Sequence, residues 1–146
     1  MEFMVLSRDK IEHYNTDKKH IVISVSDPGY DSPMLPENLN RVGILCLYFH
    51  DVNDSEYVDN KEIKGFDRHN AIAILNFFET FRDYVDLVIC QCEAGISRSS
   101  AIAGALCKIS GQDDSKFFKE YLPNSFVYNS IIKEYYEGGE REDEDN

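Results

Sequence analysis

The eight-residue segment from Cys92 to Ser99 constrains the fold of this chain more than any other part of its sequence. It reads Cys-Glu-Ala-Gly-Ile-Ser-Arg-Ser, follows the apolar run Leu87–Gln91, and leads into the alanine-rich helical pattern Ser99–Leu106. This order predicts a strand, a tight loop and a helix, with the backbone N–H groups of the loop turned inward above the helix N-terminus. Such a loop binds anions, and it favours the thiolate form of a cysteine held at its centre.

The residue types within the segment suit a tetrahedral phosphate. Arg98 supplies a planar guanidinium fork that matches two oxygens of such a group. Gly95 can adopt the positive φ that a tightly curved cradle requires. Ser99, at the start of the helix, can donate a hydrogen bond to the sulfur of Cys92. A cysteine and an arginine at this spacing recur by chance in many chains, so the interpretation also depends on the strand-loop-helix context. The candidate substrate-binding residues are Glu93, Ala94, Gly95, Ile96, Ser97 and Arg98.

The segment resembles the signature of the cysteine-dependent protein tyrosine phosphatase superfamily. Together with Val25–Gly29 and Phe49–Val52, it is similar to the compact dual-specificity-like enzymes and to a group of prokaryotic predicted tyrosine phosphatases. The resemblance implies a hydrolase of phosphate monoesters, acting on a phosphorylated protein or a small aryl phosphate. It further implies a phosphocysteine intermediate on Cys92, with no metal and no cofactor. The family has histidine where this chain has Gln91, and glutamine supplies no charge, so we expect reduced activity and not its loss.

A second loop must supply the proton for the leaving oxygen, because the phosphate cradle encloses the other side of the substrate. The segment Phe49–Val52 follows a predicted strand and resembles the acid loop of the compact phosphatases. We therefore predict Asp51 as the general acid, and then as the base for the hydrolytic water. Asp54 is the alternative. Both lie at the start of a polar loop, His50–Gly65, that is long enough to suggest function.

Alternating strand and helix patterns predict an α/β fold with a central parallel sheet of about four to five strands, covered by helices on both faces. The run Val42–Phe49 is apolar enough to be buried on both faces. Ligands in such sheets bind beyond the strand C-termini, where Asp27, Asp51 and Cys92 fall. The predicted strands are Phe3–Leu6, His20–Val25, Val42–Phe49 and Leu87–Gln91, and the predicted helices cover about 8–14, 67–84, 99–106, 115–121 and 126–137.

Composition limits the classes of partner. A chain of 146 residues predicts a single domain, here residues 1–137, followed by an acidic tail at 138–146 that we expect to be disordered. The net charge of −12 argues against nucleic acid and anionic membranes as partners. No apolar run approaches the length of about 18 residues that spans a bilayer. Four cysteines without framework spacing indicate reduced thiols and a cytoplasmic protein.

Two other functions remain open on the sequence. Gln91 and the choice between two acids are compatible with a phosphate- or phosphopeptide-binding module that has little catalytic activity. A rhodanese-like sulfurtransferase would also hold a cysteine on an amide-lined loop, although the Arg98-Ser99 ending argues against it. The histidines His13, His20, His50 and His69 show no metal-binding spacing.

Overall fold

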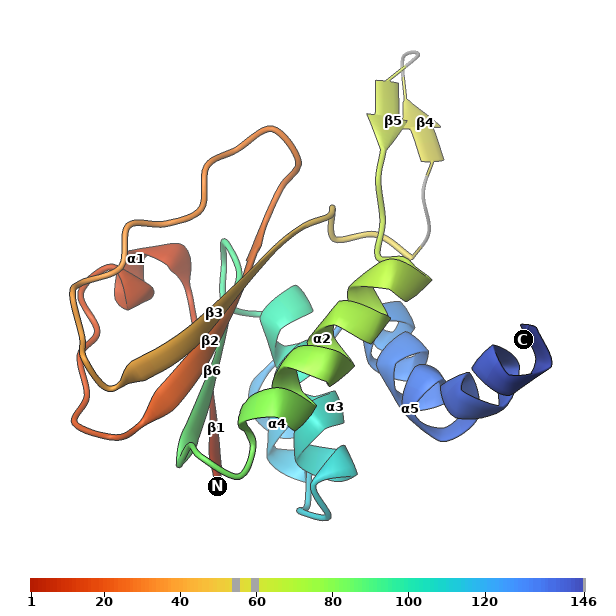
Figure 1. Cartoon of the computed structure of the whole chain (residues 1–146). Coiled ribbons are helices and arrows are strands. Elements are labelled where there is room, and N and C mark those ends of the chain that lie inside the picture. Colours follow the sequence, from red (N-terminus) through yellow and green to blue (C-terminus); the bar gives the residue numbers. More distant parts are fainter. Residues whose placement is uncertain (54–55, 59–60, 146) are drawn as a thin grey trace.

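In a computed structural model of the chain, a parallel β-sheet forms the centre of an α/β fold (Figure 1). The structure describes residues 1–53, 56–58 and 61–145. Within these residues the central sheet has four strands, and each neighbouring pair is parallel. The four predicted strands are confirmed. In their order across the sheet they are β1 (Glu2–Leu6), β6 (Leu87–Gln91), β2 (His20–Ser26) and β3 (Arg41–Tyr48).

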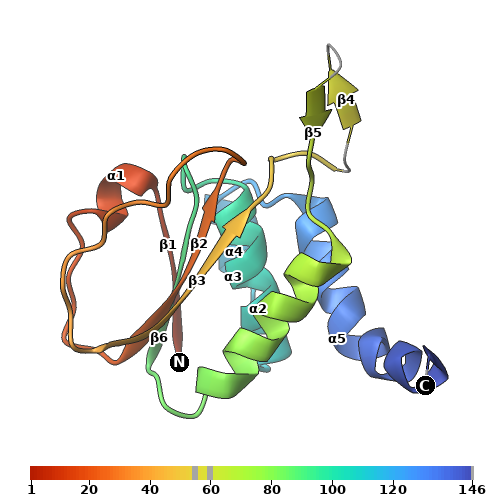
Figure 2. The same cartoon turned by 45° about the horizontal axis from the view of Figure 1, so that its top comes forward.

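Helices lie on both faces of the sheet, as predicted (Figures 1 and 2). On one face, α2 (Arg68–Phe81) and α3 (Arg98–Ile109) contact the strands, and α5 (Ser125–Asp145) packs against both helices. The short α4 (Ser115–Glu120) lies against α3. On the other face lies α1 (Arg8–Ile11), whose Ile11 packs with sheet residues. Among the helices that the structure describes, none has both the length and the apolar character needed to cross a membrane.

The side chains of β2 explain why the sheet has a core on each side. Alternate residues of a strand point to opposite faces, so Ile21 and Ile23 join the large core under α2 and α3, whereas Val22 joins the smaller core with Ile11. All seven residues of β2 are buried. This two-sided burial is typical of an inner strand in a parallel sheet, and it fixes the strand end that carries Asp27.

The strand β3 departs from the prediction that its apolar run is buried on both faces. Its side chains alternate between one side that is partly or fully buried and one that is exposed, where Val42 and Ile44 are 40% and 47% exposed. The prediction was wrong because β3 is an edge strand that α2 covers on one side only. On the covered side, Gly43 lies so close to Phe81 that an added Cβ would come within 2.9 Å of its ring.

The long polar loop after β3 contains regular structure. β4 (Glu56–Val58) and β5 (Lys61–Ile63) form an antiparallel hairpin, which stands out from the domain above the start of α2 in Figure 1. Asp54, the alternative general acid, lies outside the described residues. At the other end of the chain, α5 continues to Asp145, through residues that the sequence analysis assigned to a tail. The acidic segment is rich in glutamate, which is a good helix former.

Candidate active site

The segment predicted as an anion cradle forms a loop that connects β6 to α3. Its first half is anchored to the end of β1, since Cys92 N donates to the Leu6 carbonyl at 3.4 Å and Arg8 N donates to the Glu93 carbonyl at 3.1 Å. Gly95 has φ of +68°, and a Cβ at this position would lie 2.6 Å from the backbone nitrogen of Ser7. The loop can therefore pack this closely against β1 only with glycine at its apex.

Cys92 and Ser99 meet at the base of this loop. The Ser99 hydroxyl oxygen lies 3.0 Å from Cys92 Sγ, and both side chains are buried. This geometry allows the serine hydroxyl to donate to a thiolate or to a departing sulfur. Cys90 lies two residues earlier on β6 and is completely buried. Burial raises the pKa of the Cys90 thiol, so Cys90 stays protonated and is unsuited to act as a nucleophile.

Arg98 is held by the ends of two strands. Its Nη1 donates to Asp27 Oδ1 at 2.6 Å and to the Phe49 carbonyl at 2.8 Å. The arginine side chain is only 8% exposed, whereas that of Asp27 is 41% exposed. The side-chain hydrogen bonds of Arg98 to described residues use Nη1, which leaves the Nε and Nη2 groups available to a ligand. Asp27 was predicted from the sequence to lie with Asp51 and Cys92 at the strand C-termini, and its contact with Arg98 is a finding of the structure.

Asp51 lies beside the opposite part of the loop. Its Oδ1 accepts hydrogen bonds from Ser97 Oγ at 2.9 Å and from Asn124 Nδ2 at 2.8 Å. Asn124 also donates through its backbone N–H to the Ser97 carbonyl at 3.0 Å. The structure thus brings Asp51, predicted from the sequence, next to the loop that contains Cys92.

Asn124 is a site residue that the sequence analysis missed. Besides holding Asp51, its Oδ1 accepts from Val127 N at 3.0 Å, which caps the first turn of α5. An asparagine before a helical pattern can be recognised as a cap. Its contact with Asp51 spans 73 positions of the chain, and no local pattern predicts it.

Gln91 lies directly beneath the loop and is fully buried. Its Oε1 accepts a hydrogen bond from Ser24 Oγ at 2.5 Å. Within the described part of the chain, Gln91 Nε2 and the nearby strand residue Ser26 Oγ are buried without a hydrogen-bond partner. Unpaired buried polar groups cost about 1–3 kcal/mol each. The position before the cysteine therefore carries a neutral hydrogen bond from Ser24 and no positive charge.

A cavity of about 450 Å³ opens beside the loop and is lined in part by Asp27 and Glu93. Arg8 joins two of the other lining residues, because its Nη1 donates to the Asp31 carbonyl at 2.9 Å and lies 3.6 Å from Glu93 Oε2. Three of its lining residues are acidic, and Tyr30 is 70% exposed at its edge. No group of three or more histidine, cysteine or acidic side chains in the described residues could hold a metal ion.

The structure is similar to the crystal structure of human DUSP28, a dual-specificity phosphatase. The TM-score is 0.60 over 90% of this chain and 89% of that chain, at 14% sequence identity. At this identity the similarity establishes a shared fold and transfers no residue role. Comparison of the sequence with protein-family models and with curated proteins gives no match.

Proposed function

We propose that this protein is a metal-independent phosphate monoester hydrolase of the cysteine-dependent tyrosine phosphatase superfamily, in its dual-specificity-like group. Its substrate is a phosphotyrosine-containing protein or a small aryl phosphate. The observation that carries the proposal is the 3.0 Å contact between Cys92 Sγ and Ser99 Oγ, at the base of a loop that also presents Arg98. The fold shared with human DUSP28 supports the same function.

The proposed reaction has two displacements at phosphorus. The Cys92 thiolate attacks, an S–P bond forms, and the P–O ester bond breaks while Asp51 gives its proton to the leaving oxygen. Arg98 and the amides of the loop stabilise the charge on the oxygens that stay on phosphorus. Asp51 then accepts a proton from water, which attacks phosphorus and releases phosphate. Ser99 donates a hydrogen bond to the sulfur as it departs.

The assignment of the acid depends on the contacts of Asp51 with Ser97 and Asn124. These contacts hold its carboxylate beside Ser97 of the loop. Asp54 stays the alternative acid. A cytoplasmic location is part of the proposal, because all four cysteines are free thiols and reducing compartments keep thiols in that state.

Turnover of para-nitrophenyl phosphate in the presence of a chelator tests the proposal. We expect the wild type to hydrolyse it, vanadate to inhibit, and Cys92→Ser to be inactive. Cys90→Ser is the matched control, because it changes a buried cysteine two residues earlier, on β6, and it should retain activity. Turnover that persists in Cys92→Ser, or that disappears with the chelator, would exclude the mechanism.

A second candidate is a phosphopeptide-binding module with little catalysis. Two observations favour it: Gln91 contributes no charge beneath the loop, and Asp27 occupies one nitrogen of Arg98. Such a module would bind a phosphotyrosine peptide through the same loop, and binding would be weakened by Arg98→Lys. The distinguishing result is binding without turnover over the whole range from acidic to neutral pH.

A further inference from the structure

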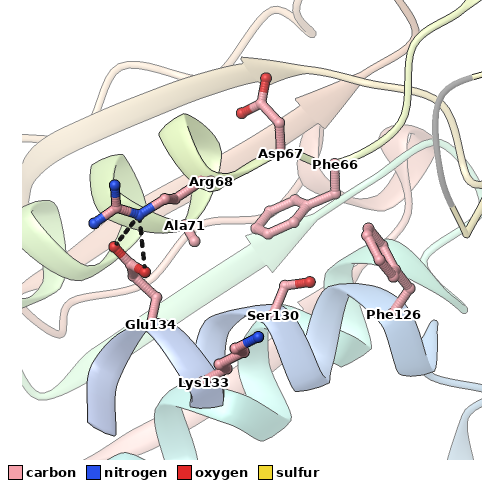
Figure 3. Close-up of a pocket in the computed structure, with 8 residues that line it drawn as sticks. All are labelled: Phe66, Asp67, Arg68, Ala71, Phe126, Ser130, Lys133 and Glu134. Carbon is pink, nitrogen blue, oxygen red and sulfur yellow. Dashed lines mark hydrogen bonds and ion pairs between the residues drawn. The ribbon is translucent and has the colours of Figure 1, made fainter. Parts of the chain in front are cut away.

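A small cleft lies between the start of α2 and the first half of α5, and none of its residues belongs to the proposed phosphatase site (Figure 3). Phe66 and Ala71 line it from the α2 side, and Phe126 and Ser130 line it from α5. Its volume is about 130 Å³. An apolar cavity of about 150 Å³ can hold benzene, so this cleft has the size of one six-membered ring.

The apolar wall of the cleft is preformed. Phe66 is 3% exposed, and its ring packs edge-on against Phe49 with centroids 5.0 Å apart. The next residue, Asp67, fixes the first turn of α2, because its carboxylate accepts from Asn70 N at 2.9 Å. Ala71 is 1% exposed. A ring that enters would therefore not have to order these residues, which lowers the free-energy cost of binding.

Of the charged side chains around the cleft, some are already paired and one is not. Arg68 and Glu134 form a closed ion pair, with Nε at 2.9 and 3.2 Å from the two carboxylate oxygens. The carboxylate of Asp67 is engaged by the helix cap. Lys133 is exposed at the rim, and within the described residues it has no acidic partner. Of the four charged residues in the lining, two acidic and two basic, Lys133 is the one whose charged group is not already in a hydrogen bond or ion pair with a described residue.

The cleft continues along α5 into a second cavity of about 440 Å³, with Phe126, Ser130 and Lys133 in both linings. Asn129 and Asn53 extend this second cavity. Apart from Lys133, its lining residues carry no charge. An anionic group attached to a ring in the cleft would therefore emerge among a lysine, a hydroxyl and side-chain amides, all of which can donate hydrogen bonds.

We propose that this cleft is a binding site for a monocyclic aryl acid. The aromatic ring lies between Phe66 and Phe126, and the acid group lies beside Lys133 and Ser130. The aromatic walls select a flat apolar ring, the cleft volume of about 130 Å³ matches a single ring, and Lys133 selects an anion over a cation. The proposal does not depend on the phosphatase activity.

Titration of the full chain with 3-phenylpropionate, followed by amide NMR shifts, tests the site. Two matched probes separate the ring from the charge: 3-phenylpropanamide lacks the charge, and propionate lacks the ring. For a ligand of this size we expect a Kd of roughly 1 mM, with the amide probe at least fivefold weaker and propionate not measurable. The shifted amides should be those of Phe66, Phe126 and Lys133.

Variants decide whether the cleft is responsible. Lys133→Met keeps the aliphatic stem and removes the charge, so it should weaken binding of the acid to the level of the amide probe. Lys119→Met makes the same change on α4 and should leave binding unaltered, and unshifted β2 amides should verify folding. Equal binding of acid and amide by the wild type, no binding at 10 mM probe, or an unchanged Kd in Lys133→Met would overturn the proposal. Displacement of the probe by vanadate would do the same, because it would locate the probe in the Cys92 loop.

Discussion

Arg98 obtains its orientation from the ends of two strands and not from the loop alone. Its Nη1 donates to Asp27 and to the Phe49 carbonyl, at 2.6 and 2.8 Å, and these two contacts fix the orientation of the guanidinium. Since a fork of donors must match two phosphate oxygens, binding depends on the orientation of the guanidinium. Asp27 therefore contributes orientation to a group that we propose binds the substrate.

Replacement of Asp27 tests this contribution. Asp27→Ala should lower kcat/KM for para-nitrophenyl phosphate by roughly tenfold, the order expected from loss of a charge-assisted hydrogen bond. Asp27→Asn keeps an acceptor oxygen and should lose less. Asp31→Asn is the control, because Asp31 lines the same cavity without contacting Arg98 through its carboxylate. If Asp27→Ala is as active as the wild type, the Phe49 carbonyl alone is enough to orient Arg98.

The role of Asp51 as general acid can be tested by varying the leaving group of the substrate. Asp51→Asn should slow hydrolysis of phenolic and alkyl esters by roughly 10²–10⁴-fold, the usual contribution of general acid catalysis. The loss should shrink for esters with very acidic leaving groups, which need little protonation. Steady-state kinetics on a series of aryl phosphates measures both effects, and Asp54→Asn should be nearly silent in the same series. If Asp54→Asn shows the leaving-group dependence instead, the role of acid passes to Asp54.

At the scale of the elements, the junction between β1 and the Cys92 loop leaves no room for a side chain at Gly95. Gly95→Ala would place a Cβ 2.6 Å from the backbone nitrogen of Ser7 at φ of +68°, so the backbone must shift. We expect both a lower melting temperature and at least tenfold weaker vanadate inhibition. Positive φ alone costs a non-glycine residue about 1–2 kcal/mol, so this is the loss of stability expected if the added Cβ met no clash.

The variant Gly111→Ala separates the effect of the steric clash with Ser7 from the effect of the positive φ. Gly111 has φ of +86° and nothing within 4 Å of an added Cβ, so this variant should lose stability without losing affinity for vanadate. Thermal unfolding and inhibition constants of the two variants provide the comparison. Equal behaviour of Gly95→Ala and Gly111→Ala would mean that the contact with β1 does not shape the loop.

The four strands were predictable because each is a compact apolar run bounded by polar residues. The position of β3 at the sheet edge was not, because the order of strands depends on which helices cover them and not on the run itself. For the site, the loop from Cys92 to Ser99 was predictable because its residues are contiguous. The ion pair of Asp27 with Arg98 joins residues 71 positions apart. The position of Asp27 at a strand end makes it a candidate site residue, but that position does not predict that its partner is Arg98.

At the scale of the whole molecule, the net negative charge of the protein repels the phosphate group that we propose the loop binds. The net charge is −12, and the cavity beside the loop is lined by Asp27, Asp31 and Glu93 against Arg8 alone. A phosphate dianion approaching from solvent therefore meets repulsion first and the donors of the loop only at close range. A polyanionic substrate such as a phosphoinositide would meet more repulsion than a phosphotyrosine peptide. Hence we expect preferential hydrolysis of the peptide.

Ionic strength tests this balance. Between about 0.01 M and 0.15 M salt the Debye length falls from roughly 30 Å to 8 Å, which screens the distant acidic charges more than contacts within the loop. With a phosphotyrosine peptide that carries no other charge, kcat/KM should therefore rise by roughly two- to fivefold over this range. Glu93→Gln should flatten the rise, because it removes a charge at the cavity, and Glu79→Gln on α2 should flatten it less for the same change in net charge. If kcat/KM instead falls as salt is added, attraction by Arg8 and Arg98 dominates the approach of the substrate. The predicted preference for peptides over phosphoinositides would then lose its electrostatic basis.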